Sequence, residues 1–259
     1  MQTQSDNQIL KIALFATGCA GIIAEFVLST LATYLSGNAV FQWTLVMSFM
    51  LFAMGVGSRL SRMFKTALLE WFIMTEFLLS IACATSAVIA YGLAAIIQPI
   101  NLLIYTQGII VGTLIGLEIP LVTRINESYE NLRINISNVM EKDYYGSLIG
   151  GIIFAFVALP YLGLTYTPII LGCINFIVAT LVLWRFMPLI RYKTVFKLTW
   201  SACFVFYLSV FFGQTHYSIW RAKQIQRQDC LFQANSVSKN CNYTVAAVQL
   251  VISQWSGSV

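Results

Sequence analysis

Charged side chains are scarce in this chain. Of its 259 residues only 10% are Asp, Glu, Lys or Arg, and it has 1 histidine and 5 prolines. Soluble domains carry roughly a quarter charged residues. Here 58% of the residues are hydrophobic, and the mean hydropathy is +0.77. A soluble fold of this length cannot hide so much apolar surface, so the sequence predicts an integral membrane protein whose main partner is the lipid bilayer.

Long apolar segments follow one another with short breaks between them. Seven of them reach or approach the roughly 20 residues that a helical crossing needs. Helices are expected because lipid offers no hydrogen-bond partner to the backbone, and the alternation typical of a membrane β-barrel is absent. We therefore predict an all-α bundle of about seven transmembrane helices. The predicted spans are residues 11–34, 39–57, 68–92, 99–121, 144–162, 166–187 and 195–213.

Lysine and arginine collect in alternate connections between these spans, which predicts an orientation and no nucleic-acid partner. The positive-inside rule puts the basic connections in the cytoplasm, together with the N-terminal segment 1–10. The seven-helix domain 11–213 would then sit in the cell inner membrane, with the short polar tail 214–259 outside. The tail's own excess of basic residues argues instead for the cytoplasm. The basic residues of the three charged connections are Arg59, Arg62 and Lys65, then Arg124, Arg133 and Lys142, then Arg185, Arg191 and Lys193.

Glu25 stands in the middle of the first predicted span. A carboxylate at such a position is costly and requires a protein or water environment. Small residues lie within about 40° of it on a helix, namely Gly18, Gly21, Ser29 and Ala32. A face of small residues packs against other helices, so we expect Glu25 to point into the bundle. Two interpretations stay open: a cation or proton site, or a buried hydrogen bond made by a protonated carboxyl group.

Two further acids interrupt apolar spans. Glu76 lies in the third span on a face of small and polar residues, and Glu118 lies near the end of the fourth. Glu118 shares a side of its helix with Gln107, about three turns earlier. Together with Glu25, these three residues are our candidates for binding a cation or a proton. For Glu118 an ion pair with a loop cation such as Arg124 is the structural alternative.

Glycines recur at four-residue spacing in the fourth and fifth predicted spans, and two glycines of the first span lie three residues apart. Such spacing lets two helix backbones approach closely. We expect the glycines of the fourth span to pack against those at the start of the fifth. The predicted packing residues are Gly18 and Gly21 in the first span, Gly108, Gly112 and Gly116 in the fourth, and Gly146 and Gly150 in the fifth.

Cysteine and histidine show no metal-binding spacing. Four of the 6 cysteines lie inside predicted spans, where we expect them to pack as small apolar residues. Cys230 and Cys241 lie in the tail, where they either pair or remain free thiols. The sequence therefore predicts no metal and no cofactor.

Six short motifs in a fixed order resemble the membrane domain of the membrane-bound spermidine synthases, which form part of the polyamine aminopropyltransferase family. The resemblance covers about residues 18–212 and is most specific at Asp143-Tyr-Tyr-Gly-Ser-Leu-Ile-Gly-Gly151. The family also resembles, distantly, half of a major-facilitator transporter. The other motifs are Gly18-Cys-Ala-Gly-Ile-Ile-Ala-Glu25, Phe52-Ala-Met-Gly-Val-Gly-Ser-Arg59, Gly116-Leu-Glu-Ile-Pro-Leu121, Leu159-Pro-Tyr-Leu-Gly-Leu164 and Gly172-Cys-Ile-Asn175.

The resemblance implies a role in polyamine biosynthesis. In full-length members a soluble domain follows the last span and transfers an aminopropyl group from decarboxylated S-adenosylmethionine to putrescine. Here 46 residues follow Gly213, with one glycine and one acid, Asp229, among them. We expect these residues to be too few for that domain, and the stretch 249–255 resembles only its opening strand.

Two functional hypotheses follow from the sequence. The first is a membrane domain of a spermidine-synthase-like protein that is not catalytic by itself and works with a soluble aminopropyltransferase or with a second copy of this chain. No catalytic residue can be transferred from the family to this sequence. The alternative is a transporter or binding protein for small cations such as polyamines, in which the candidate carboxylates would bind the cation.

Overall fold

The described part of the chain is helical throughout. The computed structural model describes residues 2–93, 100–127 and 132–210. The predicted tail 214–259, including Cys230 and Cys241, lies outside these residues. The α-helices are α1 (Gln2–Ser36), α2 (Ala39–Leu60), α3 (Leu68–Leu93), α4 (Ile100–Asn126), α5 (Leu132–Ile153) and α6 (Gly163–Phe186). Short 3-10 turns, η1 (Ser61–Met63) and η3 (Met187–Leu189), a π-helical stretch, η2 (Phe154–Leu162), and a further helix at 193–210 complete the described elements.

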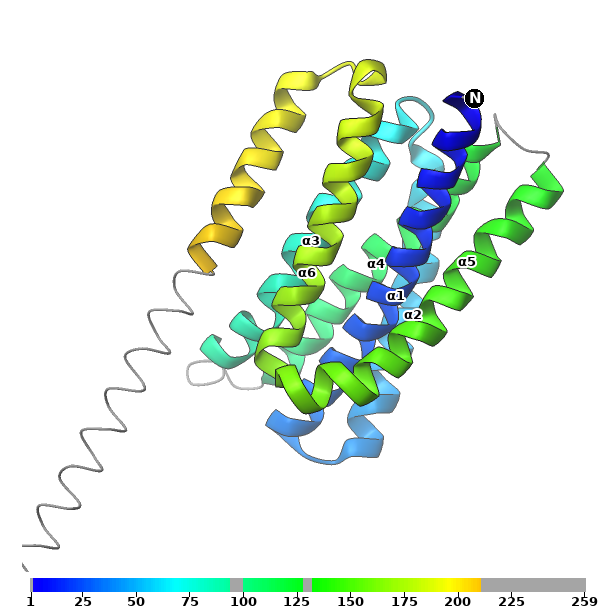
Figure 1. Ribbon diagram of the computed structural model, residues 1–259. Helices are drawn as coiled ribbons and strands as arrows, with labels where there is room; N and C mark the ends of the chain where they lie inside the picture. Colours follow the sequence, from blue (N-terminus) through cyan, green and yellow to red (C-terminus); the bar gives the residue numbers. More distant parts are fainter. Residues whose placement is uncertain (1, 94–99, 128–131, 211–259) are drawn as a thin grey trace, which may run out of the picture. The chain divides into compact units, whose positions relative to one another are not determined.

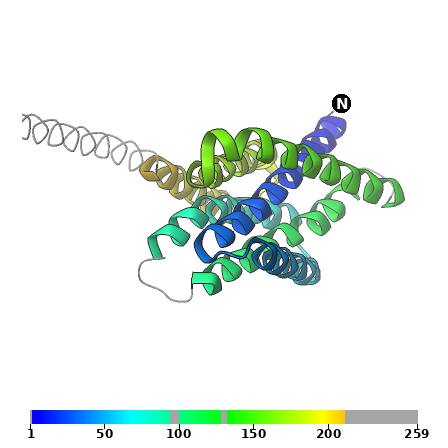
Figure 2. The ribbon, with the colours of Figure 1, turned by 90° about the horizontal axis from the view of Figure 1, so that it is seen from below.

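The chain divides into two compact units, Met1–Phe204 and Val205–Val259. In the first unit α1 packs against α2, α4, α5 and α6, while α2 packs on α4 and α3 packs on both α4 and α6. The view along the bundle shows α1 among the other helices (Figure 2). Of the second unit the structure describes only residues 205–210, which continue the helix that begins at 193.

Five segments are long and apolar enough to cross a membrane by length and composition. Four correspond to the first four predicted spans. The fifth, Ile134–Leu189, is 56 residues long and includes α5, η2 and α6. The sequence predicted two separate spans there, 144–162 and 166–187, and Figure 1 shows the chain turning back between α5 and α6. The turn is at Gly163, whose φ of 65° favours glycine.

Local sequence explains the turn between the first two helices. Gly37 and Asn38 both have positive φ, at 73° and 50°. The Asn38 side chain caps α2 by accepting a hydrogen bond from the Phe41 backbone N–H at 3.4 Å. Glycine and asparagine are the residues that adopt this conformation most readily, so α1 ends and α2 begins within two residues.

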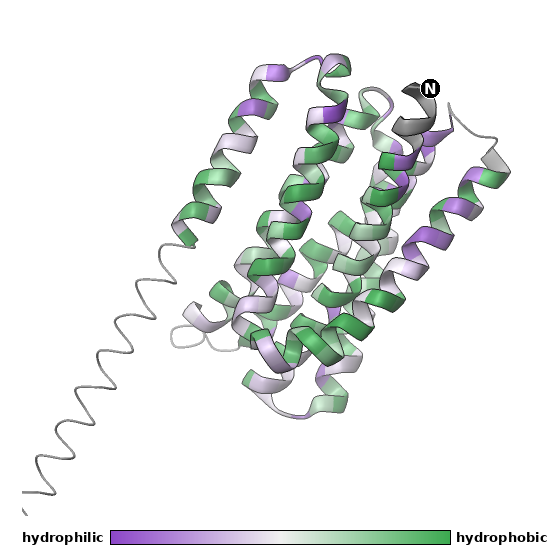
Figure 3. Cartoon of the chain, in the orientation of Figure 1, coloured by the Kyte–Doolittle hydropathy of each residue, from purple (hydrophilic) through white to green (hydrophobic). Residues whose placement is uncertain are grey.

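Hydrophobic residues cover the outside of the bundle as well as its interior. One core contains Leu28 and Met50, and a second contains Phe72 and Phe77. The outward sides of the helices are also largely hydrophobic (Figure 3), and Trp184 is 80% exposed. Monomeric soluble proteins rarely expose apolar surface on this scale, so this exterior requires an apolar environment.

Glycines bring α2 and α4 into close contact. A Cβ atom added to Gly116 would lie 2.1 Å from the Met54 carbonyl oxygen, and one added to Gly112 would lie 2.8 Å from the Met50 carbonyl oxygen. In return, a Cβ at Gly57 would lie 2.1 Å from the Thr113 carbonyl oxygen. The partner of the α4 glycines is therefore α2, and Gly57 belongs to the packing set although its spacing did not mark it.

The glycines of α5 pack against α1. A Cβ at Gly146 would lie 2.2 Å from the Phe15 carbonyl oxygen, and one at Gly150 would lie 2.6 Å from the Cys19 carbonyl oxygen. The expectation that these two glycines pack against α4 was wrong, because α1 occupies that face of α5. Gly108 and Gly21 make looser contacts, with the side chains of Met50 and Ile115 respectively.

Candidate functional site

Two carboxyl groups meet in the interior of the bundle. Glu76 of α3 is 0% exposed and Glu118 of α4 is 1% exposed. Glu118 interacts electrostatically with Glu76, and the two helices that carry them pack against each other. Among the described residues neither oxygen of Glu76 has a hydrogen-bond partner, and Oε1 of Glu118 has none. Buried polar atoms without partners are costly, which makes this pair the strongest candidate site.

The helix periodicity of α3 explains how Glu76 reaches this position. Glu76, Ser80 and Cys83 follow at intervals of four and three residues and so share one helix face. The Ser80 hydroxyl donates to the Gly172 carbonyl oxygen of α6 at 2.9 Å, which ties this face to α6. In α4, Pro120 lacks the N–H that would bond the carbonyl of Gly116, so the helix is irregular beside Glu118.

Two neighbours of the pair were not among the residues singled out from sequence. Asn175 of α6 is fully buried, and its amide nitrogen lies 3.9 Å from the Cys83 sulfur while its amide oxygen has no partner among the described residues. Cys83 interacts electrostatically with both Glu76 and Glu118. The only signal in the sequence was the Gly172-Cys-Ile-Asn175 motif, which contributed to the family resemblance and predicted no contact.

The second neighbour is Asp143 of α5, which interacts electrostatically with Glu118. The backbone of Gly18 on α1 comes close to Asp143. A Cβ atom added to Gly18 would lie 2.8 Å from Oδ1 of Asp143. Ser147, one turn further along α5, donates to the Gly18 carbonyl oxygen at 3.2 Å. We refer to Glu76, Glu118 and Asp143 together as the carboxyl cluster.

The other two candidates lie apart from the carboxyl cluster. Gln107 of α4 donates its amide to the Ala82 carbonyl oxygen of α3 at 2.6 Å, so it links two helices. Glu25 of α1 is only half-buried, although Ser29 and Ala32 on the same face are fully buried. No electrostatic interaction between Glu25 and the carboxyl cluster is seen in the described part of the chain.

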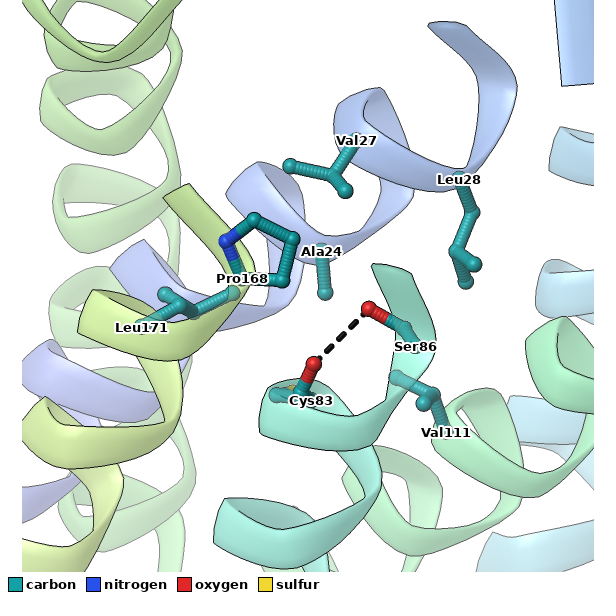
Figure 4. Close-up of a pocket in the computed structure, with 8 residues that line it drawn as sticks. All are labelled: Ala24, Val27, Leu28, Cys83, Ser86, Val111, Pro168 and Leu171. Atoms are coloured by element: carbon teal, nitrogen blue, oxygen red, sulfur yellow. Dashed lines mark hydrogen bonds between the residues drawn. The ribbon is translucent and has the colours of Figure 1, made fainter. Parts of the chain in front are cut away.

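A small cavity beside Cys83 lies between α1, α3, α4 and α6. Figure 4 shows apolar side chains such as Leu28 and Leu171 around it, with Ser86 donating to the Cys83 carbonyl oxygen at 2.7 Å. Its volume is about 10 Å³, which holds roughly one water molecule. It is too small for a polyamine.

Arg124 does not pair with Glu118. Its Nη1 donates to the carbonyl oxygens of Ser61 and Phe64, at 3.1 and 2.8 Å, and so holds the end of α2 and η1 against α4. Arg124 is therefore not the cation of the ion-pair alternative for Glu118. The reason is geometric: Arg124 lies six residues beyond Glu118 on the helix, which places it outside the buried interior.

The described residues contain no group of three or more His, Cys, Asp or Glu side chains arranged to hold a metal ion. Cys19, Cys83, Cys173 and Cys203 are free thiols.

Curated proteins from several bacteria match most of this chain. A protein of Aquifex aeolicus named "Polyamine aminopropyltransferase 2" is 44% identical over 215 residues, which are 82% of this chain and 42% of the relative. A "Polyamine aminopropyltransferase" of Oceanobacillus iheyensis is 34% identical over 211 residues, 79% of this chain and 41% of the relative. One of Leptospira interrogans is 32% identical over 186 residues, 72% and 37% respectively. The chain thus spans less than half the length of these relatives.

No family model matches the chain, and no solved structure matches it. The family assignment therefore rests on the similarity to these relatives.

Proposed function

Because the chain belongs to the polyamine aminopropyltransferase family, we propose that it is the multi-pass membrane domain of a spermidine-synthase-like protein serving polyamine biosynthesis. The observation that carries this proposal is the 44% identity to the Aquifex aeolicus protein across 82% of the chain. Identity of this extent in a segment this apolar supports a shared membrane domain.

The apolar exterior and the distribution of charge support the membrane location. Five segments are long and apolar enough to cross. We propose seven crossings in the inner membrane, with α5, α6 and the helix at 193–210 each counted once, and a bundle related to half of a major-facilitator transporter. The N-terminus is then cytoplasmic, as the basic residues Arg59 and Arg62 after α2 favour.

Aminopropyl transfer itself is assigned to sequence that the relatives have beyond the matched segment. Glu76 and Glu118 lie in the bundle interior, where the neighbouring cavity is about 10 Å³, so they have no room beside them for a nucleoside substrate. We propose that the membrane domain anchors and positions a soluble aminopropyltransferase, with a second copy of the chain as a further partner. The transporter alternative is not favoured, because the relatives are named as transferases.

The proposed orientation predicts opposite labelling of two connections. In a background with Cys230→Ser and Cys241→Ser, we expect Arg62→Cys to react with a membrane-impermeant maleimide only in inverted vesicles. Gly37→Cys, in the turn between α1 and α2, should react only in intact cells. Labelling of both positions from the same side would contradict the crossing of α2.

If the membrane domain only anchors and positions a separate aminopropyltransferase, the chain alone should form no spermidine. Membranes containing it, incubated with putrescine and decarboxylated S-adenosylmethionine, should give no product above membranes without it. Adding the cognate soluble aminopropyltransferase should give product that sediments with the membranes only when the chain is present. Spermidine formed by the purified chain without any addition would contradict the proposal, as would a soluble enzyme that stays in the supernatant.

A further inference from the structure

We propose that Glu76 and Glu118 form a proton-binding site, in which at least one of the two buried carboxyl groups keeps its proton at neutral pH. The site is independent of the anchoring role proposed above. It follows from the burial of the pair and from the partners that its oxygens lack.

Ionisation of both groups is excluded by their surroundings. Phe72 and Phe77 of α3 and Leu121 of α4, all 0% exposed, belong to one apolar core and flank the pair on the same two helices. Two interacting carboxylates in such a medium repel each other, and each would also lose its hydration. The ion pair seen among the described residues, Lys142–Glu141, lies at the surface and does not compensate this charge. At least one of the two groups must therefore keep its proton.

The hydrogen-bond inventory points in the same direction. Among the described residues, four of the buried atoms without partners belong to the pair and to Asn175, and all four are acceptors: both oxygens of Glu76, Oε1 of Glu118 and the amide oxygen of Asn175. The other two are Ser29 Oγ and Asn126 Oδ1. Asn175 lies against the same face of α3, through Cys83, and gives an independent observation of a missing donor. A retained proton turns one carboxyl oxygen of the pair into an O–H donor.

A proton fits this site better than a larger cation. The described residues form no metal-binding group, and the cavity beside Cys83 has a volume of about 10 Å³. An alkylammonium group would need more space than that, whereas a proton bound to a carboxyl oxygen needs no cavity.

The neighbouring groups set the sign of the pH dependence. The titratable groups that face the pair are Cys83 of α3 and Asp143 of α5. From α6 the facing group is the neutral Asn175, and α2 presents Met50, Met54 and glycines to α4. All the titratable neighbours are acids, so none of them offsets a negative charge on the pair.

The folded chain should therefore bind a proton that the unfolded chain releases near neutral pH. Because stability falls with rising pH wherever the folded state binds more protons, we expect the thermal unfolding midpoint in detergent to fall from mildly acidic to mildly alkaline pH. Glu118→Gln removes one titrating group of the pair and its repulsion of Glu76, so this fall should shrink to less than about half of the wild-type value. Glu141→Gln, at the surface, serves as the control and should keep the full fall.

Infrared spectroscopy of the unmodified chain gives a second reading that needs no variant. At neutral pH the spectrum should contain the carbonyl stretch of a protonated carboxylic acid that exchanges slowly in D₂O, and this band should be absent in Glu118→Gln. Absence of the band in the wild-type chain would overturn the proposal. So would a midpoint that rises with putrescine or sodium chloride at constant pH in the wild type but not in Glu118→Gln, since the site would then bind an ammonium group or a metal ion.

Discussion

Replacement of Gly57 by alanine should destabilise the bundle by about 3 kcal/mol or more, because the interior has no space for one additional methyl group. The new Cβ would lie 2.1 Å from the Thr113 carbonyl oxygen and 3.1 Å from the Gly116 carbonyl carbon. Both contacts are with the α4 backbone, which cannot rotate away as a side chain can. Forcing extra atoms into packed interiors costs about 1–3 kcal/mol and occasionally more, and a shift of α4 would also disturb Glu118.

Gly55 provides a matched control on the same helix. A Cβ added there meets no atom of the described residues within 4 Å. Alanine is favoured over glycine in a helix by up to about 1 kcal/mol, so Gly55→Ala should be neutral or slightly stabilising. The measurement is loss of helical circular dichroism during titration with sodium dodecyl sulfate. Equal effects of the two substitutions would show that α2 and α4 do not pack as described.

The second large effect is expected where α5 contacts the end of α4. Replacing Asn135 of α5 by alanine should lower the free energy of unfolding by about 3 kcal/mol. Asn126 and Asn135 are 1% and 0% exposed. The Asn126 amide donates to Oδ1 of Asn135 at 2.9 Å, and the Asn135 amide donates to the Thr123 carbonyl oxygen at 2.7 Å. Removing Asn135 leaves the Asn126 donor buried without a partner, which costs about 1–3 kcal/mol, and it also loses the link between α4 and α5.

Ser137 is the control for this prediction, since it is exposed on the same helix. Ser137→Ala should change stability by less than about 0.5 kcal/mol. A double-substituted chain, Asn126→Leu with Asn135→Leu, should recover much of the loss because no buried donor is then left without a partner. If the single Asn135→Ala variant unfolds at the wild-type detergent concentration, the amide pair contributes little to the packing of α5 on α4.

The sequence was sufficient to single out Glu76 and Glu118, because an acid in an apolar helix stands out from its neighbours. The sequence was not sufficient to show that Glu76 and Glu118 interact. That depends on the relative register of α3 and α4, and many weak packing contacts set this register. Asn175 and Asp143 were not predicted as site residues for the same reason. Their positions near the pair depend on how α6 and α5 pack in the bundle.

Glu25 shows the opposite case. Its small-residue face was read correctly as a packing face, since Gly18, Ser29 and Ala32 are buried. The carboxyl group itself is only half-buried and lies apart from the carboxyl cluster. A helix face about 100° wide can put its edges in different environments, and only the positions of the neighbouring helices decide which residue is enclosed.

The helical class and the family were determined by the sequence alone, because scarce charge and long apolar runs favour helices, and because the chain is 44% identical to a relative over 82% of its length. The tertiary structure alone decided which helices touch. Spaced glycines permit close approach to any neighbouring helix, and Gly112 and Gly116 meet α2 while Gly146 and Gly150 meet α1. The choice depends on the packing of the whole bundle, since each helix can fill the groove of only one neighbour on a given face.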